Sequence, residues 1–348
     1  MKILIIGPNP DVPVIGGVVT HVANVARYYK KTGSNDVSIL DTTFHKDGKK
    51  KTILQSLWTI LSKKYSKYHL IYVNTSIYFS SLVKLGYLLR RINMDCTAGK
   101  VIVQFHGGTL QNITGLKKFI LKRLLSQKTL STGTCYMFLT GEQKREFGKW
   151  FPYTEKKLML STHLVQVEAE YPKKDFSQIK VLFLSRIEKE KGIYEVIEAA
   201  QKLEEKPDIH FYIAGQGSEA EAVERKVKNS KNITYVGAVM GDLKEELIKE
   251  CNVFCLLSSA EGLPYALLEN MAWGNIPIVT DTGRMKEFAA KNESGFIVSK
   301  DSNELCGALE QLMNDRGLAA QKSYNAYLTI KKMQDGEQSD KCFRVLQN

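Results

Sequence analysis

Two carboxylates frame a short loop and a predicted helix start in the second half of the chain. The segment EGLPYALLENMAWG begins at Glu261, and Glu269 follows eight residues later. Pro264 suits the first turn of a helix, so backbone N–H groups in residues 262–266 would be free to bind a ligand. Glu261 could accept hydrogen bonds from sugar hydroxyls, and Glu269 could take both hydroxyls of a ribose. The spacing therefore predicts a site for a ligand built from a sugar, a diphosphate and a ribose.

Two cations lie at an earlier strand end that suits the same ligand. Arg186 ends the run VLFLSR, and Lys191 follows five residues later, just before a glycine and a helix. An arginine fork and a lysine point charge both bind phosphate oxygens. The alternative is that Glu188 and Glu190 simply pair with these cations at the surface.

Glycines and a histidine mark three further strand ends. Gly16 and Gly17 precede a helix, His106 follows the strand VIVQF, and Gly215 begins a Gly-Gln-Gly turn. Glycines at such turns let backbone N–H groups approach a ligand, and a histidine could contact a sugar or a phosphate. A flexible turn and a structural histidine are the alternatives. Because the third glycine of the dinucleotide fingerprint is missing, an NAD enzyme is disfavoured.

The net charge of +12 is unevenly distributed along the 348 residues. Residues 1–160 hold 25 Lys and Arg against 8 Asp and Glu, a net +17, whereas the rest holds 24 against 29, a net −5. The first half should therefore meet an anionic partner. No apolar run is long enough to span a membrane, and the first apolar run is too short for a signal peptide. The six scattered cysteines show neither a disulfide framework nor zinc spacing, so we expect a reduced, cytosolic protein.

The elements that would position these residues alternate between short apolar runs and helical stretches, typical of βαβ winding. The expected strands are 2–7, 37–41, 69–73, 100–105 and 135–139, then 179–184, 209–213, 232–236, 253–257, 276–279 and 295–298. The expected helices are 18–31, 53–66, 77–92, 116–128 and 141–149, then 193–203, 218–229, 242–250, 264–273, 284–290 and 302–314.

The rhythm breaks at residues 161–178, which predicts two domains. The fold class is α/β, with two doubly wound Rossmann-like domains facing a cleft: residues 1–165 form an acceptor-side domain and residues 178–320 a donor domain. The polar, helix-prone tail is expected to cross back, with 325–348 joining the first domain. A ligand should sit at the carboxyl ends of the strands.

Taken together, these motifs resemble retaining GT-B glycosyltransferases of the family 4 type, whose E-x(7)-E pattern Glu261 and Glu269 match. The resemblance covers most of the chain and is more specific in the second half. It implies the GT-B fold and the transfer of a sugar from a nucleotide diphosphate sugar with retention of the anomer. The chain departs from many relatives in STHLVQVEA at 161–169 and in EGLP where they have EGFG, which concerns the donor sugar.

The resemblance also implies roles for single residues. Arg186 and Lys191 would neutralise the diphosphate, and His106 would contact the sugar near its 6-hydroxyl. The catalytic set would be His106, Arg186, Lys191 and Glu261. The donor-binding set would be Gly16, Gly17, Gly215, Val236, Gly237, Gly262, Leu263, Pro264 and Glu269, with Glu269 on the ribose and Val236 and Gly237 near the base.

No Asp-x-Asp triplet is present, so we expect no metal and no cofactor besides the nucleotide sugar, with a UDP-sugar favoured over a GDP-sugar. Without an obvious covalent nucleophile, front-side departure and attack is the expected mechanism. The cations and the helix start would then stabilise the departing diphosphate.

The basic first half is expected to provide the acceptor side. Residues 115–128, GLKKFILKRLLSQK, interleave apolar and basic side chains and predict an amphipathic helix that suits an anionic membrane surface. The resemblance implies a polyprenyl-diphosphate-linked or glycan acceptor in cell-envelope polysaccharide, O-antigen or capsule synthesis. The protein would be peripheral on the inner face of the plasma membrane, and nucleic acid is disfavoured.

Alternatives stay open at this point both for the activity and for residues 115–128. A glycoside phosphorylase or a sugar-nucleotide epimerase could use the same scaffold, and a non-catalytic module could bind nucleotide sugar without turnover. A core-facing helix with solvated lysines is the alternative for residues 115–128.

Overall fold

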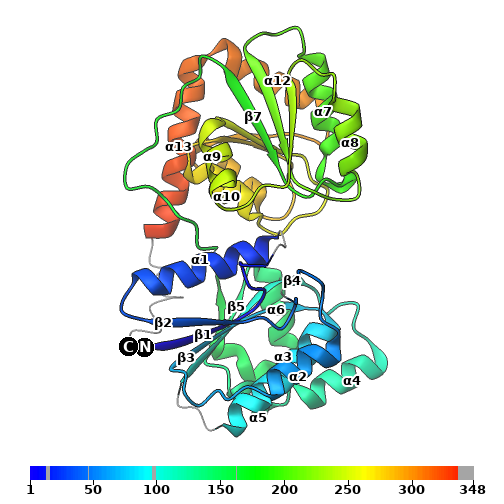
Figure 1. The fold of residues 1–348 in the computed structure, drawn as a ribbon, viewed down its shortest axis with the longest axis vertical. Helices are drawn as coiled ribbons and strands as arrows, with labels where there is room; N and C mark the ends of the chain where they lie inside the picture. The colour runs from blue at the N-terminus through cyan, green and yellow to red at the C-terminus, as the bar shows by residue number, and fades with distance from the viewer. Residues whose placement is uncertain (13–15, 46, 96–98, 162, 336–348) are drawn as a thin grey trace. The chain divides into compact units, whose positions relative to one another are not determined.

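In the computed structural model, the described residues are 1–12, 16–45, 47–95, 99–161 and 163–335, and the chain divides into two compact units (Figure 1). The first unit covers Met1–Leu164, and the second begins at Val165 and includes the last described helix. Each unit contains one six-stranded sheet. All the strand pairs are parallel. The predicted α/β class with two doubly wound sheets is confirmed.

The sheet of the first unit has the order β2-β1-β3-β4-β5-β6. Its strands are β1 (Lys2–Ile6), β2 (Asp36–Leu40), β3 (Leu70–Ile77), β4 (Lys100–Gly108), β5 (Cys135–Phe138) and β6 (Leu158–Leu160). Its helices are α1 (Gly17–Lys31), α2 (Ile53–Leu61), α3 (Phe79–Met94), α4 (Gly115–Leu124), α5 (Gln127–Ser131) and α6 (Gly141–Trp150).

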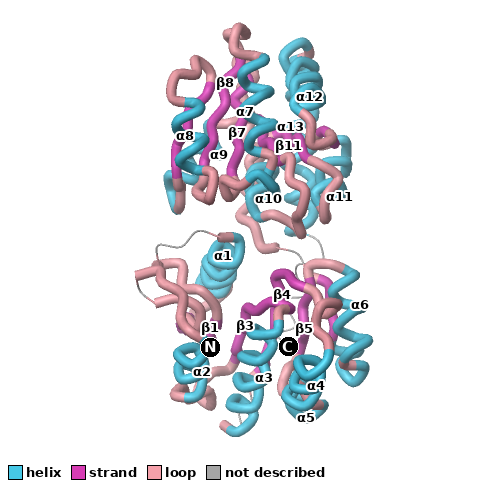
Figure 2. The backbone as a smooth tube through the Cα atoms, turned by 90° about the vertical axis from the view of Figure 1, so that its right-hand side faces the viewer, coloured by secondary structure: helices cyan, strands magenta, loops and turns pink. Residues whose placement is uncertain are grey.

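Successive side chains of the central strand β1 enter different cores, because side chains alternate between the two faces of a sheet. Ile3 and Ile5 are buried in the core that includes α1, whereas Leu4 and Ile6 are buried in the core that includes α3 and α4. Figure 2 shows α2, α3 and α4 in a row, away from α1. The sheet is thus covered on both faces, as parallel sheets require.

The sheet of the second unit has the order β12-β11-β10-β7-β8-β9. Its strands are β7 (Ile179–Leu184), β8 (Ile209–Ala214), β9 (Ile233–Gly237), β10 (Val253–Leu256), β11 (Ile276–Val279) and β12 (Phe296–Ile297). Its helices are α7 (Ile193–Lys202), α8 (Ala220–Val227), α9 (Gly241–Glu250), α10 (Tyr265–Ala272), α11 (Met285–Ala290), α12 (Ser302–Asn314) and α13 (Arg316–Asp335).

Each sheet reverses its winding direction at one place. In the first unit β1 lies between β2 and β3, and in the second unit β7 lies between β10 and β8. In open parallel sheets the loops after the two strands at such a switch point leave a crevice for ligands. Ligand-binding residues are therefore expected after β1 and β3 in one unit, and after β7 and β10 in the other.

The first unit differs most from the sequence-based expectation in three elements. The helix expected over 116–128 is two helices, because the Ser126 side chain accepts a hydrogen bond from the Thr129 N–H and caps a new start. The helix expected over 53–66 ends at Leu61, since Tyr65 turns inward and donates its hydroxyl to the Ile60 carbonyl at 2.9 Å. The strand β6 was not expected, because three residues are too few to show a period.

The tail also differs from the expectation that residues 325–348 join the first domain. Residues 325–335 belong to α13, whose Ala326 and Ile330 are buried in the core of the second unit. These apolar side chains recur at helical spacing and pack within the second unit. Residues 336–348 lie outside the described residues.

Candidate functional site

Two loops meet at the switch point of the second sheet. One follows β7 and contains the short 3₁₀ turn Lys189–Lys191, and the other follows β10. The Ser259 N–H donates to the Glu190 carbonyl at 2.8 Å. Gly192 has φ +78°, and a Cβ there would lie 2.4 Å from the Leu257 carbonyl oxygen. Because only glycine allows this approach, the backbone fixes the two loops relative to each other.

Lys191 and Glu261 form an ion pair between these loops. The Lys191 ammonium donates to Glu261 Oε1 at 2.6 Å and to the Ala260 carbonyl at 3.1 Å. The two side chains are only 9% and 15% exposed. An ion pair that is removed from water in this way needs close geometry to offset its desolvation, and it is costly to break from one side. Two residues that the sequence assigned to the same ligand thus lie in direct contact.

Glu269 is paired with a lysine that the sequence analysis did not identify. The Lys244 ammonium of α9 donates to both carboxylate oxygens of Glu269, at 2.7 and 2.9 Å. The side chains are 22% and 15% exposed. These two hydrogen bonds fix the orientation of the Glu269 carboxylate on α10. Lys244 was missed because it stands in the acid-rich stretch GDLKEELIKE, where it looks like one more solvated charge.

Arg186 is in a more open environment than Lys191. Its guanidinium contacts Glu188 Oε1 at 2.5 Å, and its side chain is 62% exposed. The alternative that Glu188 pairs with a nearby cation is thus confirmed for Arg186. Lys191 pairs with Glu261 instead. The two cations after β7 therefore differ in both their partner and their exposure.

The turns after β7, β8 and β9 pack closely through their backbones. Gly215 has φ +147°, and a Cβ there would lie 1.8 Å from the Ser185 carbonyl oxygen. The Gly215 N–H donates to the Gly237 carbonyl at 2.7 Å, and the Tyr235 hydroxyl donates to the Gly215 carbonyl at 3.0 Å. Gly215 therefore has a packing reason to be glycine. Val236 is 40% exposed beside these turns.

The loop between Glu261 and α10 is fastened to the loop after β11. The Arg284 N–H donates to the Gly262 carbonyl at 2.8 Å, and a Cβ on Gly283 would lie 2.3 Å from that same oxygen. Leu263 is buried, and Pro264 is the N-cap of α10 in an extended conformation without a side-chain cap. This arrangement fixes the backbone amides that the sequence analysis expected at the site.

The remaining predicted site residues belong to the first unit. His106 lies at the end of β4, half-buried, and its Nε2 is 2.9 Å from Asn74 Oδ1. Burial, with a smaller contribution from His163, lowers the pKa of His106 to about 3. Gly16 is the N-cap of α1 and Gly17 is its first residue. A Cβ on Gly16 would meet nothing within 4 Å, so protein packing does not require glycine there.

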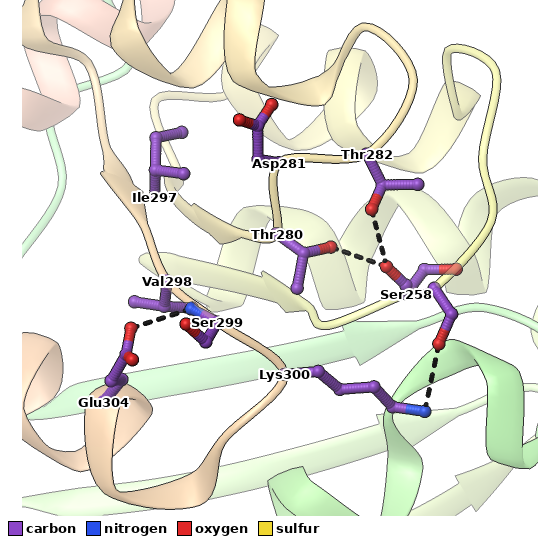
Figure 3. A pocket seen from close by; sticks show the side chains of 10 residues that line it. Ser258, Thr280, Asp281, Thr282, Ile297, Val298, Ser299, Lys300 and Glu304 are labelled. Carbon is purple, nitrogen blue, oxygen red and sulfur yellow. Dashed lines mark hydrogen bonds between the residues drawn. The ribbon is translucent and has the colours of Figure 1, made fainter.

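A polar pocket of about 370 Å³ lies at the carboxyl ends of β10, β11 and β12 (Figure 3). Lys300 is on its wall, and its ammonium donates to the Lys189 carbonyl at 2.8 Å and to Ser259 Oγ at 3.3 Å. Lys300 therefore braces the two site loops from the side of the pocket. The lining residues are Ser258, Ser259, Thr280, Asp281, Thr282, Ile297, Val298, Ser299, Lys300 and Glu304.

Among the described residues, no group of three or more histidine, cysteine, aspartate or glutamate side chains is arranged to hold a metal ion. Cys251 and Cys255 are buried in the core of the second unit, where they pack among apolar side chains.

Comparison with known proteins finds a family likeness in the second unit. Residues 168–329 match the model for glycosyl transferases group 1, a match that covers less than half of the chain. The chain is 28% identical over 147 residues to N,N'-diacetylbacillosaminyl-diphospho-undecaprenol alpha-1,3-N-acetylgalactosaminyltransferase of Campylobacter jejuni, an alignment that covers 42% of this chain and 38% of that protein. It is also 28% identical over 144 residues to phosphatidyl-myo-inositol mannosyltransferase of Mycolicibacterium smegmatis, covering 40% of this chain and 37% of that protein. The chain thus spans less than half the length of the curated relatives that it matches.

The fold likeness extends over the whole chain. The crystal structure of Anabaena Alr3699/HepE in complex with UDP aligns with 100% of this chain and 100% of its own, with a TM-score of 0.69 and 13% sequence identity. At this identity the likeness concerns the fold, and it agrees with two Rossmann-like domains.

Proposed function

We propose that this protein is a retaining glycosyltransferase that moves a sugar from a nucleotide diphosphate sugar to a lipid-linked or glycan acceptor in cell-envelope polysaccharide synthesis. The observation that carries the proposal is the Lys191–Glu261 pair, because it joins a cation and a carboxylate at the switch point of the group 1 domain. This is where open parallel sheets bind nucleotides.

The hydrogen bonds within this pair leave groups of both side chains able to bind the nucleotide sugar. An ammonium has three N–H donors, and Lys191 uses two of them on Glu261 and Ala260. The third can bind a diphosphate oxygen, and the other carboxylate oxygen of Glu261 can accept from a sugar hydroxyl. Lys191 would then stabilise the charge of the departing nucleoside diphosphate while Glu261 holds the sugar.

Arg186 and Glu269 complete the proposed donor site. The exposed guanidinium of Arg186 would add a second cation for the diphosphate, and Glu269 would bind the ribose while Lys244 keeps its carboxylate oriented. We further propose that these cations replace a metal ion, and that attack occurs on the face from which the diphosphate leaves. The complex of Anabaena Alr3699/HepE with UDP supports UDP as the preferred nucleotide.

The names of the two relatives support a lipid-linked acceptor, since one contains diphospho-undecaprenol and the other phosphatidyl-inositol. None of the helices described is long and apolar enough to cross a membrane. On the basis of these two names, we propose that the protein reaches a lipid acceptor by binding to the inner surface of the plasma membrane.

A surface of the first unit has the chemistry for such binding. We call it the docking face and define it as the exposed apolar side chains Leu54, Trp58 and Leu61 of α2 and Leu116, Phe119 and Ile120 of α4. Leu54, Trp58 and Leu116 are 75%, 74% and 73% exposed. Around them stand exposed cations, of which α4 contributes Lys117, Lys118, Lys122 and Arg123.

Exposed apolar side chains beside cations favour one occupant for this face. An anionic bilayer surface offers both an acyl boundary for the apolar side chains and headgroup charge for the lysines. The alternative of a core-facing helix holds only for Leu121 and Leu124 of α4, which are buried. Gly86 lets α4 pack on α3, because a Cβ there would lie 2.4 Å from Leu124 Cγ.

A thermal-unfolding screen against UDP, GDP, ADP and their sugars tests the proposed donor site. A ligand present at 100 times its dissociation constant should raise the free energy of unfolding by about 2.7 kcal/mol. Stabilisation by one nucleotide class supports the proposal, and the absence of any shift with all three classes contradicts it.

A further inference from the structure

Three histidine rings lie together at the carboxyl edge of the first sheet. The rings of His21 and His106 are 4.5 Å apart between centroids, and His163 lies 5.9 Å from His21 and 6.4 Å from His106. They come from α1, the end of β4 and the segment after β6. His21 and His163 are buried, whereas His106 is half-buried.

Asn74 of β3 is held in one orientation beside this cluster. Its Nδ2 donates to the Ile6 carbonyl at 3.1 Å, and a carbonyl oxygen can only accept. The amide is therefore assigned with Oδ1 on the side of His106, at 2.9 Å from Nε2. Because Oδ1 is also only an acceptor, the proton of this hydrogen bond must belong to His106 Nε2.

This assignment leaves the other ring nitrogen as an acceptor. We propose that Asn74 is the positioning residue that locks His106 in the neutral tautomer with its proton on Nε2, so that Nδ1 accepts a hydrogen bond from a hydroxyl group of the substrate. The inference rests on the proposed function, together with the expectation from the family resemblance that His106 contacts the sugar near its 6-hydroxyl. It also excludes a hydrogen bond from His106 Nδ1 to a phosphate oxygen. In this tautomer Nδ1 has a lone pair and no proton to donate.

The surroundings of the ring keep it uncharged. Burial is the main cause that lowers the pKa of His106 to about 3, and the neighbouring His163 lowers it further. His21 also faces the ring, and burial holds its own pKa well below the ordinary value. The hydroxyl of Tyr72, 3.1 Å from His21 Nε2, is a further titratable group beside these rings. A second proton on His106 would therefore be unfavourable at neutral pH.

Nitrogen-15 NMR of the histidine rings in the full chain tests the tautomer without any need for activity. The chain has six histidines, and the His106→Gln variant identifies the signals of this ring. We expect the pattern of an Nε2–H tautomer that does not change between about pH 5 and pH 8. An Nδ1–H pattern, or titration near the ordinary histidine pKa of about 6.5, would overturn the proposal.

Two substitutions of Asn74 separate positioning from a merely structural role. Asn74→Asp keeps an acceptor oxygen and adds a negative charge, so His106 should stay Nε2–H while its pKa rises. Asn74→Ala removes the acceptor, and the single-tautomer pattern should be lost. Tyr72→Phe is the matched control, because it removes the partner of His21 and should leave the His106 signals in place. An unchanged His106 pattern in folded Asn74→Ala would contradict the assignment, and if that variant does not fold, the wild-type and Asn74→Asp spectra decide.

Steady-state kinetics test whether His106 Nδ1 accepts a hydrogen bond from the substrate. Loss of one hydrogen bond corresponds to a fall of about three- to tenfold in kcat/KM for Asn74→Ala. Asn74→Asp should lose activity at acidic pH, whereas the wild type should not. An activity that does not change with pH in either protein would contradict the proposal. If no nucleotide sugar is bound or turned over, the proposed function fails while the NMR result stands; if turnover occurs with the other tautomer, only this inference fails.

Discussion

The two units place their charges in opposite ways. In the second unit Lys191 and Glu261, in the loops after β7 and β10, form a largely buried ion pair. In the first unit the cations of α4 are exposed and stand beside exposed apolar side chains. Residues 161–348 carry a net charge of −5, whereas residues 1–160 carry a net charge of +17.

This difference indicates two kinds of anionic partner. Paired charges at a switch point are already oriented, so they suit a small ligand that binds in one geometry. Exposed cations suit an extended anionic surface, to which many orientations are equivalent. Salt should separate the two, because exposed charges are screened beyond about 8 Å at physiological ionic strength and partly buried pairs are screened less.

The largest effect is expected at the buried pair. Lys191→Met leaves the Glu261 carboxylate without its partner, and breaking a buried pair from one side costs about 3–5 kcal/mol of unfolding free energy. Urea unfolding measures this loss. Arg186→Ala is the matched comparison, because its exposed ion pair should contribute no more than about 1 kcal/mol. Equal losses of unfolding free energy in the two variants would contradict the claim that the Lys191 pair stabilises the fold more than the Arg186 pair does.

Both cation variants should lower turnover more than they weaken donor binding, if the cations stabilise the departing diphosphate. Steady-state kinetics that show only a higher KM, with kcat unchanged, would mean that the cations act in the ground state alone.

The docking face should respond to the removal of its cations. Each Lys or Arg near an anionic membrane contributes about 1 kcal/mol, so replacing Lys117, Lys118, Lys122 and Arg123 with Gln should weaken vesicle binding by up to about a thousandfold at low salt. Sedimentation with acidic-lipid vesicles measures the change. Turnover of a soluble acceptor should be nearly unaffected, because the proposed donor site lies in the other unit.

A control of the same composition is available in the second unit. Replacing the exposed Lys206, Arg225, Lys226 and Lys228 with Gln removes the same charge from the protein and should leave sedimentation close to that of the parent. Equal losses in both quadruple variants would mean that net charge, and not this face, governs binding. If the docking-face variant sediments as the parent does, α4 is not the membrane contact.

A smaller effect is expected for the ribose contact. Glu269→Ala should weaken binding of the free nucleoside diphosphate, since hydrogen bonds to a charged group contribute about 1.5–3 kcal/mol. Isothermal titration calorimetry measures the affinity without any sugar or acceptor. Lys244→Met is the companion variant: it keeps the carboxylate and should lose less affinity than Glu269→Ala. An unchanged affinity for Glu269→Ala would refute the ribose role.

The smallest change in turnover is expected when metal ions are removed. If Arg186 and Lys191 take the place of a metal ion, turnover in EDTA should equal turnover in untreated buffer. Activity that disappears in EDTA and returns with manganese or magnesium would overturn this part of the proposal.

The second unit could be predicted from the sequence more completely than the first. Its strands are short apolar runs such as residues 253–256 that end in charged or glycine-containing turns, so strand and site residues appear together along the chain. What the sequence did not show is which charges pair across elements. Lys244 and Glu269 are 25 residues apart, and only the packing of α9 beside α10 brings them into contact.

The first unit shows why periodicity alone does not identify a surface. Leu54, Trp58 and Leu61 recur at helical spacing, which predicts a helix with one apolar side. The pattern does not say whether that side meets the protein core or another partner, and here it is exposed. Asn74 was likewise missed, because its contact with His106 depends on the pairing of β3 with β4 in the sheet.

The most direct test of the central claim is to follow nucleotide sugars by proton NMR with the purified protein and a lipid-linked acceptor fraction. The account predicts that one class of α-linked donor, with UDP favoured, is consumed while its nucleoside diphosphate is released, and that the first product carries the α anomer. Lys191→Met should abolish this signal without preventing nucleotide binding. A product that first appears as the β anomer, or no consumption of any UDP-, GDP- or ADP-sugar, would contradict the assignment of this chain as a retaining glycosyltransferase.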